Sequence, residues 1–260
     1  MRCSEIIKRL EILTPSAFAK DWDNVGLLAG RSTKEIKKIF LAVDATDEVI
    51  EAAIDARADM LLTHHPLIFT PIKSITDEDF IGRRVLRLLQ ADICYYAMHT
   101  NFDVLGMADA AADEMLLQNK QVLEITYEDE FSKEGIGRYG RLPEVMTLAE
   151  CASYVKEIFH LQTVRVYGEP DEQLEIAAIS PGSAKSVIPY AVKAGVDVLI
   201  SGDIDHHMGI DLIAQNIAVI DAGHYGLEKL FIPYMQDYFT ETLPEMIIEA
   251  AGEKSPFTVI

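Results

Sequence analysis

The fold is decided by three consecutive segments, KIFLAV (38–43), DEVIEAAIDARA (47–58) and DMLLTHH (59–65). The first and third are short apolar runs, which are typical of buried strands, and the middle segment has apolar residues at helical spacing. A strand, a helix and a second strand in this order predict a parallel strand pair in an α/β fold.

A second part of the chain has the same order, with LEIAAIS (174–180), AKSVIPYAVKAG (184–195) and VDVLISGD (196–203). At a constant offset of 138, six positions in the two parts are identical. They are Val49/Val187, Ile50/Ile188, Ala53/Ala191, Ala56/Ala194, Asp59/Asp197 and Leu61/Leu199. Shared apolar positions occur in any two such units, but the match favours a duplication.

A second repeated sequence pattern supports the duplication. ICYYAMHTNFD (93–103) and IAVIDAGHYGLE (217–228) each have an apolar strand, a histidine and, four residues later, an acid, at an offset of 125. We therefore predict two similar α/β halves, 1–125 and 126–260, with mainly parallel sheets flanked by helices. Between the repeated parts, residues 121–170 are expected to form small strands around a helix, and the chain after Ile232 a helix and a short tail.

Composition excludes several classes of function. The chain has 260 residues and a formal net charge of −19, from 42 acidic and 23 basic residues, which argues against non-specific nucleic-acid binding. No apolar run is long enough for a membrane span. The first residues, MRCSEIIKRLEILTP, are typical of an amphipathic helix rather than a signal peptide. Three widely spaced cysteines predict no disulfide framework, and we expect a cytoplasmic location.

The candidate site residues lie where predicted strands end, which is where open α/β sheets place their chemistry. The set comprises His64, His65, Asp103, His224 and Glu228, with His99 nearby. Imidazole and carboxylate ligands without thiolate suit Zn²⁺, Mn²⁺, Fe²⁺ or Ni²⁺. One metal would need only part of this set, and five ligands fit two divalent cations better. We expect this site in the cleft between the halves.

These segments resemble those of the GTP cyclohydrolase type-two-like family, also called the Nif-three-like family. The similar blocks are DWDNVGLLAG (21–30), LLTHHPLIF (61–69), HTNFD (99–103), SGD (201–203) and DAGHYGLE (221–228). The resemblance implies a dinuclear centre with His64, His65, Asp103, His224 and Glu228 as ligands, and Glu228 as the bridge. It also implies a homohexamer. Val104–Met107 and Ser180–Ser183 depart from the family's usual glycine-rich sequence.

Other polar or aromatic residues near these blocks have less certain roles. His99 is interpreted as a ligand or as a group that supports the ligands. In GDIDHHMG (202–209), direct metal binding is one interpretation of the acids and histidines, but the favoured role of His207, His206 or Asp203 is proton transfer or hydrogen bonds to the ligands. Trp22 either stacks on a substrate ring or packs to brace the ligand loop, and the second is favoured. Asn24 and Gly26 are expected to let this loop approach the metals closely.

Two functions compete. The first is a metal-dependent hydrolase in which a metal-bridging hydroxide attacks carbon or phosphorus, as in GTP ring opening or phosphoester hydrolysis. A triphosphate needs cationic contacts, for which Arg138, Arg141, Lys185 and Lys229 are the candidates. The second is a non-enzymatic metal-binding regulator or scaffold that works through partner interactions. A metal store or sensor is a third possibility.

Overall fold

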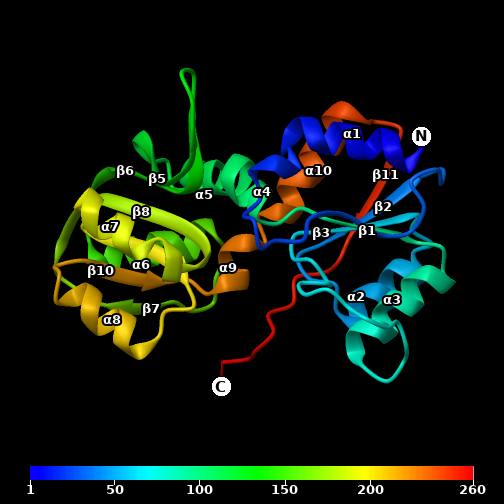
Figure 1. The fold of residues 1–260 in the computed structure, drawn as a ribbon. Coiled ribbons are helices and arrows are strands. Elements are labelled where there is room, and N and C mark those ends of the chain that lie inside the picture. Colours follow the sequence, from blue (N-terminus) through cyan, green and yellow to red (C-terminus); the bar gives the residue numbers. More distant parts are fainter. Residues whose placement is uncertain (260) are drawn as a thin grey trace. The chain divides into compact units, whose positions relative to one another are not determined.

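The computed structural model describes residues 1–259, which form two compact units. Unit 1 comprises Met1–Phe102 and Phe231–Lys254 (Figure 1). Unit 2 comprises Asp103–Leu230 and a short segment that begins at Ser255. These units do not follow the predicted division at residue 125, because the chain after Leu230 returns to the first sheet. Ile260, the last residue of the predicted second half, lies outside the described residues.

Unit 1 contains a five-stranded sheet in the order β1-β4-β3-β2-β11. Its strands are β1 (Gly26–Ala29), β2 (Lys38–Ala42), β3 (Met60–Thr63), β4 (Cys94–Ala97) and β11 (Ile247–Ala250). All neighbouring pairs are parallel except β1 and β4. The predicted strands at 38–43 and 59–65 are confirmed as β2 and β3. Part of the expected C-terminal tail is instead β11, which pairs in parallel with β2.

Helices cover both faces of this sheet, with α1 and α10 on one face and α2 and α3 on the other (Figure 1). The helices of unit 1 are α1 (Cys3–Leu13), α2 (Asp47–Asp55), α3 (Phe80–Gln90), α4 (Thr100–Phe102) and α10 (Phe231–Thr242). A 3₁₀ turn, η1 (Ser16–Phe18), follows α1. The Thr46 hydroxyl caps α2 by accepting a hydrogen bond from the Val49 N–H. Ile50 and Ala53, from the predicted helix face, are buried in the core between α2 and the sheet.

Unit 2 contains a six-stranded sheet in the order β5-β6-β8-β9-β10-β7. Its strands are β5 (Gln118–Glu128), β6 (Lys133–Thr147), β7 (Arg165–Tyr167), β8 (Gln173–Ser183), β9 (Val198–Gly202) and β10 (Ala218–Asp221). Only β8–β9 and β9–β10 are parallel, so this sheet is mixed rather than mainly parallel. The difference arises because β5 and β6 form one long antiparallel hairpin, which needs only a short turn, where small strands were expected.

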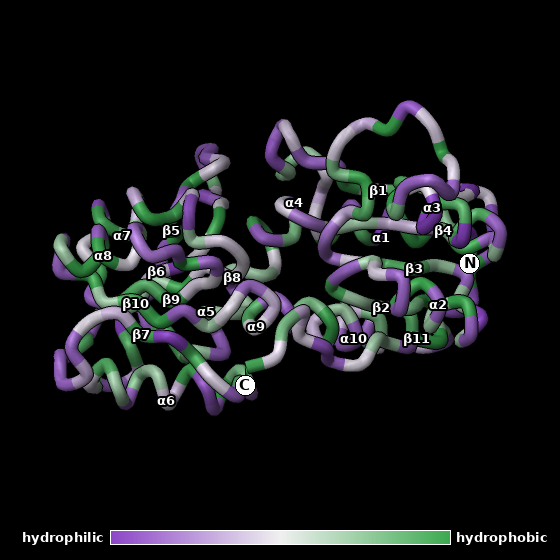
Figure 2. Tube along the Cα trace, turned by 90° about the horizontal axis from the view of Figure 1, so that it is seen from below, coloured by the Kyte–Doolittle hydropathy of each residue, from purple (hydrophilic) through white to green (hydrophobic). Residues whose placement is uncertain are grey.

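Each face of the unit 2 sheet has its own hydrophobic core. α5 (Ala108–Glu114), α6 (Leu148–Ile158) and α9 (His224–Glu228) contribute to one core, and α7 (Ile188–Ala194) and α8 (His206–Ile213) to the other. A π-helical turn, η2 (Asp103–Met107), precedes α5, and a 3₁₀ turn, η3 (Ala184–Ser186), precedes α7. Figure 2 shows that hydrophobic residues follow the strands in each unit. Across residues 1–259, no helix is both long and apolar enough to cross a membrane.

The two repeated segments make the same backbone contacts. The Asp59 carboxylate accepts hydrogen bonds from the N–H groups of Lys37 and Lys38, at 2.8 and 3.1 Å. The Asp197 carboxylate accepts from the next pair, Glu175 and Ile176, at 2.8 Å each. All three positions are related by the offset of 138, so the repeated aspartate ties the second strand of each segment to the first. A duplication explains this match, although its history stays a prediction.

In the second repeated pattern, the histidines are shifted by one residue relative to the strands that precede them. Sheet register pairs Thr63 with Ala97 in unit 1 and Ser201 with Asp221 in unit 2. Equivalent residues of the third strands are therefore 124 apart, whereas His99 and His224 are 125 apart. In consequence His99 precedes α4, while His224 is the first residue of α9.

Candidate metal centre

Unit 1 brings three imidazoles together. His64 and His65 follow β3, and His99 follows the adjacent parallel strand β4. Because parallel neighbours end at the same edge of a sheet, the three side chains meet there. One potential ligand atom from each lies within 4.8 Å of the other two. The ring centroids of His64 and His65 are each 5.3 Å from that of His99.

One nitrogen of each ring is fixed by a hydrogen-bond acceptor. His64 Nδ1 lies 2.9 Å from the Met98 carbonyl oxygen, so this nitrogen carries the proton. His65 Nδ1 lies 2.8 Å from Asp44 Oδ1, and His99 Nδ1 lies 2.9 Å from Asp23 Oδ1. With Nδ1 donating in each ring, Nε2 is the nitrogen that a metal would use, and such outer partners are typical of metal-binding histidines. The donor set therefore fits a divalent transition metal.

Asp23 is the most constrained of these partners. Its side chain is fully buried and also accepts hydrogen bonds from the Thr100 N–H and hydroxyl groups, at 2.9 and 2.6 Å. Burial opposes its ionisation, but the hydrogen bonds and the attraction to His99 outweigh burial and lower its pKa to about 2. Asp23 is therefore a fixed anion that orients His99.

The expectation that Trp22 packs to brace the loop is wrong. The Trp22 side chain is 63% exposed, and the brace is its buried neighbour Asp23. Asn24 contributes by donating from Nδ2 to the Ile68 carbonyl oxygen at 2.6 Å, which joins this loop to the segment after the histidine pair. Gly26 has a φ of +102°, which glycine adopts without strain.

Unit 2 holds a second set of ligand types, Asp103, His224 and Glu228. His224 and Glu228 are four residues apart in α9 and therefore share one face of the helix. Their closest atoms, His224 Nε2 and Glu228 Oε2, lie 3.0 Å apart. Asp103 and Glu228 each offer an oxygen within 4.8 Å of the other. Glu228 is 2% exposed, so its carboxylate is held in the interior.

Two glycines make room for α9. A Cβ atom on Gly182, whose φ is +80°, would lie 2.6 Å from Glu228 Oε1. A Cβ atom on Gly202 would lie 2.4 Å from the backbone nitrogen of His224. Any side chain at either position would therefore displace this helix or its carboxylate. The Ser180–Ser183 segment, a departure from the family pattern, keeps the glycine that the site needs.

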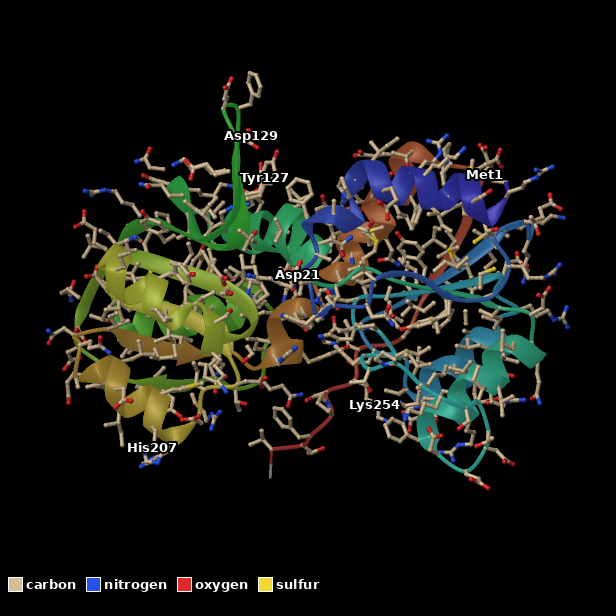
Figure 3. The ribbon with its side chains drawn as sticks, viewed as in Figure 1. Met1, Asp21, Tyr127, Asp129, His207 and Lys254 are labelled. Atoms are coloured by element: carbon tan, nitrogen blue, oxygen red, sulfur yellow. The ribbon has the colours of Figure 1, made fainter. Side chains whose placement is uncertain are left out.

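Asp203 orients a histidine rather than joining the ligand set. Its Oδ2 lies 2.8 Å from His224 Nδ1, so His224 has the same anchored geometry as the histidines of unit 1. His206 and His207 lie at the start of α8, and within residues 1–259 neither belongs to a metal-competent group. The labelled side chain of His207 points away from the ribbon (Figure 3). Its role in proton transfer, like that of Asp203, stays a prediction.

Three of the four basic residues considered for a triphosphate, all but Lys185, are engaged elsewhere within unit 2. Arg138 is 4% exposed and forms a two-point ion pair with Asp109, at 2.9 and 2.7 Å. Arg141 pairs with Glu175. The Lys229 ammonium group donates to the His160 carbonyl oxygen at 3.4 Å. These three residues therefore do not support a cationic binding site for three phosphates.

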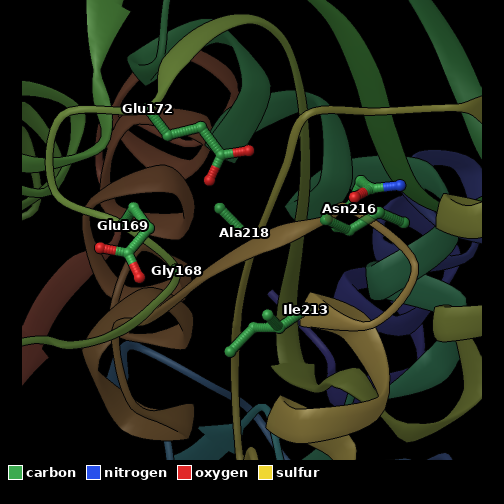
Figure 4. A pocket seen from close by; sticks show the side chains of 7 residues that line it. Gly168, Glu169, Glu172, Ile213, Asn216 and Ala218 are labelled. Atoms are coloured by element: carbon green, nitrogen blue, oxygen red, sulfur yellow. The ribbon is translucent and has the colours of Figure 1, made fainter.

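A pocket of 390 Å³ in unit 2 lies away from these ligands (Figure 4). It is lined by Glu169, Glu172 and Ala218, among others. Ala218 is the first residue of β10, whereas His224 follows the last, so the pocket opens at the other end of that strand. Within residues 1–259, neither Glu169 nor Glu172 belongs to a group of side chains that could hold a metal ion.

Sequence reasoning missed Asp23 and Asp44. Asp44 was detectable, because it lies two residues after the end of β2, and β2 is the parallel neighbour of the strand that carries the histidine pair. Asp23 lies 76 residues before His99 and after no strand of the main sheet, so no spacing in the chain connects the two.

Comparisons with known proteins agree with the family resemblance of the sequence blocks. A profile of the Duf34/NIF3 (NGG1p interacting factor 3) family matches residues 1–256. A protein of Clostridium acetobutylicum named "GTP cyclohydrolase 1 type 2 homolog" is 34% identical over 231 residues, 88% of this chain and 85% of that protein. A protein of Methanocaldococcus jannaschii with the same name is 32% identical over 253 residues, 95% of this chain and 98% of that protein.

Solved structures show the same fold. The Bacillus cereus protein related to NIF3 has a TM-score of 0.91 at 23% identity and covers 100% of this chain and 99% of its own. Reduced HcgD from Methanocaldococcus jannaschii has a TM-score of 0.83 at 31% identity, covering 96% of this chain and 97% of its own.

Proposed function

The chain belongs to the Duf34/NIF3 family, and on that premise we propose that it is a hydrolase dependent on two divalent cations. His64 and His65 of unit 1 would bind the cations together with Asp103, His224 and Glu228 of unit 2, with Glu228 as the bridge. The observation that carries the proposal is the anchoring of His64, His65 and His224, each of which has Nδ1 fixed by an oxygen acceptor.

The path of the chain supports a joint centre. The chain passes from unit 1 to unit 2 between Phe102 and Asp103, and returns between Leu230 and Phe231. Within unit 1, the rings of Phe102 and Phe231 both pack against His64, with centroids 6.1 and 5.6 Å from its ring. Asp103 directly follows Phe102 in the chain, and Glu228 lies three residues before Phe231. Both acids are thus tethered to the surroundings of His64.

Two divalent cations, when bound, lower the pKa of water toward neutrality and supply a hydroxide nucleophile. The chain's own residues provide the frame. Asp44 and Asp203 hold two imidazoles in one tautomer and orientation, and the buried Glu228 keeps its carboxylate in a fixed place. His99, held by Asp23 in the same way, is placed to accept or hold a proton beside the other two imidazoles.

Among hydrolytic reactions, opening of a cyclic amide or amidine fits better than chemistry that requires a bound triphosphate. The net charge of −19 and the engaged arginines, Arg138 and Arg141, disfavour a polyphosphate. GTP ring opening, which the relatives' name indicates for them, therefore ranks below hydrolysis of a less charged substrate.

The test is metal analysis of the purified full chain after reconstitution with Zn²⁺ or Mn²⁺, with turnover assays on phosphoesters, cyclic amides and nucleotides. We expect two equivalents of metal per chain. Asp103→Ala should lower metal content and abolish turnover together, while Asp113→Ala, an exposed acid in α5, should change neither. Full turnover by a metal-free variant would refute the proposal.

The alternative is a non-enzymatic regulator or scaffold. It is favoured if the protein binds two equivalents of metal, turns over no member of the panel and retains a partner from solution. A homohexamer, as the family resemblance implies, is part of either proposal, and its mass can be measured by sedimentation of the metal-loaded chain.

A further inference from the structure

Two exposed aromatic side chains flank His99 within unit 1. The Trp22 side chain is 63% exposed, and its ring lies edge-on to His99 with centroids 5.9 Å apart. The Phe69 side chain is 48% exposed, and its ring lies edge-on to the same imidazole at 5.7 Å. Exposed hydrophobic side chains scattered singly over a surface are ordinary, but these two aromatic rings flank the same histidine.

The loops that carry these rings are fixed in place. Asp23, next to Trp22, is buried and bonded to His99 and Thr100. Asn24 donates to the carbonyl oxygen of Ile68, the residue before Phe69. Ordering two exposed aromatic rings through partly buried hydrogen bonds is typical of a preformed ligand site rather than of a mobile surface loop.

We propose that Trp22 and Phe69 form an aromatic platform that binds a planar heteroaromatic ring beside the imidazoles of His64, His65 and His99. This inference rests on the proposed hydrolytic function and names its substrate class, a nucleobase-like ring with little negative charge. The platform supplies stacking surface, as aromatic side chains do for bases. A polar substituent of the ring would reach the potential ligand atoms of the three histidines, which lie within 4.8 Å of one another.

Charge favours a base or nucleoside over a nucleotide. Asp21 precedes Trp22 in the chain, Asp44 holds His65, and the whole chain carries a net charge of −19. A ligand with several phosphates would be repelled by this field, whereas a neutral ring would not.

The chain offers a direct probe, because Trp22 is its only tryptophan. Guanosine should quench the tryptophan fluorescence of the full-length protein, and ribose should not. In equilibrium dialysis, Trp22→Leu and Phe69→Leu should each weaken guanosine binding by about tenfold or more, while Trp22→Phe should keep most of it. Phe131→Leu is the matched control, because Phe131 is 93% exposed on the β5–β6 hairpin of unit 2.

Two measurements separate this inference from the proposed function. Stacking needs no metal, so guanosine binding by the metal-free protein supports the platform even if no turnover is found. Equal binding of guanosine by wild type and Trp22→Leu would overturn it. So would a change in sedimentation mass on Trp22→Leu without loss of guanosine binding, since Trp22 would then contact a second copy of the chain.

Discussion

Replacing Gly182 with alanine should damage metal binding far more than stability. An added Cβ atom would lie 2.6 Å from Glu228 Oε1, whereas ordinary contact begins at 3.4 Å, so a shift of 0.8 Å restores ordinary contact. Metal–ligand distances tolerate about 0.2 Å. The carboxylate is the far end of a flexible side chain and can move cheaply, but it would leave its position as a ligand. We expect the affinity for Zn²⁺ to fall by about 10- to 100-fold.

Gly195→Ala is a matched control within the same unit. Gly195 ends α7 with a φ of +64°, close to the +80° of Gly182, but a Cβ atom there meets nothing within 4 Å. Both substitutions place alanine in the left-handed region, which costs about 1–2 kcal/mol of stability in each case. Only Gly182→Ala disturbs Glu228.

Affinity would be measured by competition with a chromophoric zinc chelator, and stability by urea unfolding of the metal-free proteins. The expected result is a similar loss of unfolding free energy in both variants and a loss of zinc affinity in Gly182→Ala alone. Wild-type affinity in Gly182→Ala, or an equal loss in Gly195→Ala, would show that Glu228 does not bind the metal from this position.

Two further predictions concern the carboxylates that hold the histidines. Asp203→Asn removes the anion at His224 Nδ1 and should lower zinc affinity by about tenfold in the same competition assay, whereas Asp205→Asn keeps the cap of α8 and should have no effect. Asp23 has a pKa near 2, below its ordinary 3.8, so its ionised form stabilises the fold above pH 3.8 and that contribution is lost as the pH falls through 2. The urea midpoint of the metal-free wild type should therefore fall more steeply over this range than that of Asp23→Asn, and parallel curves would contradict this role.

Local patterns in the sequence were sufficient for the elements next to the ligands. β2, β3, β8 and β9 follow short apolar runs, and α2 follows a periodic one, because burial on one or both faces dictates these patterns. The position of His64 and His65 after β3 could be read in the same way. A strand edge is a local property of the chain, so its chemistry is visible in a single segment.

Features that depend on distant contacts could not be read from the chain. β11 pairs with β2, which lies about 200 residues earlier, and four residues of tail give no sign of that partner. The hydrogen bond that His99 donates to Asp23 and the exposure of Trp22 depend on how a loop packs against the sheet. The antiparallel β5–β6 hairpin was missed because β5 carries many exposed residues and few buried ones to mark it as a strand.

The repeat is consistent with candidate ligands that come from different elements in the two units. At the offset of 138, Asp44 of unit 1 corresponds to Gly182 of unit 2, and His64 corresponds to Gly202. Unit 1 thus carries side chains at the strand ends where unit 2 carries none. The two glycines of unit 2 are the positions whose missing Cβ atoms admit Glu228 and the start of α9.

The third equivalent pair, His65 and Asp203, shows the same exchange of roles. In unit 1 the strand-end position carries an imidazole, and Asp44 holds it. In unit 2 that position carries the acid, and the imidazole comes from His224 at the start of α9. Each unit keeps one carboxylate–imidazole pair at this edge of its sheet, with the partners interchanged.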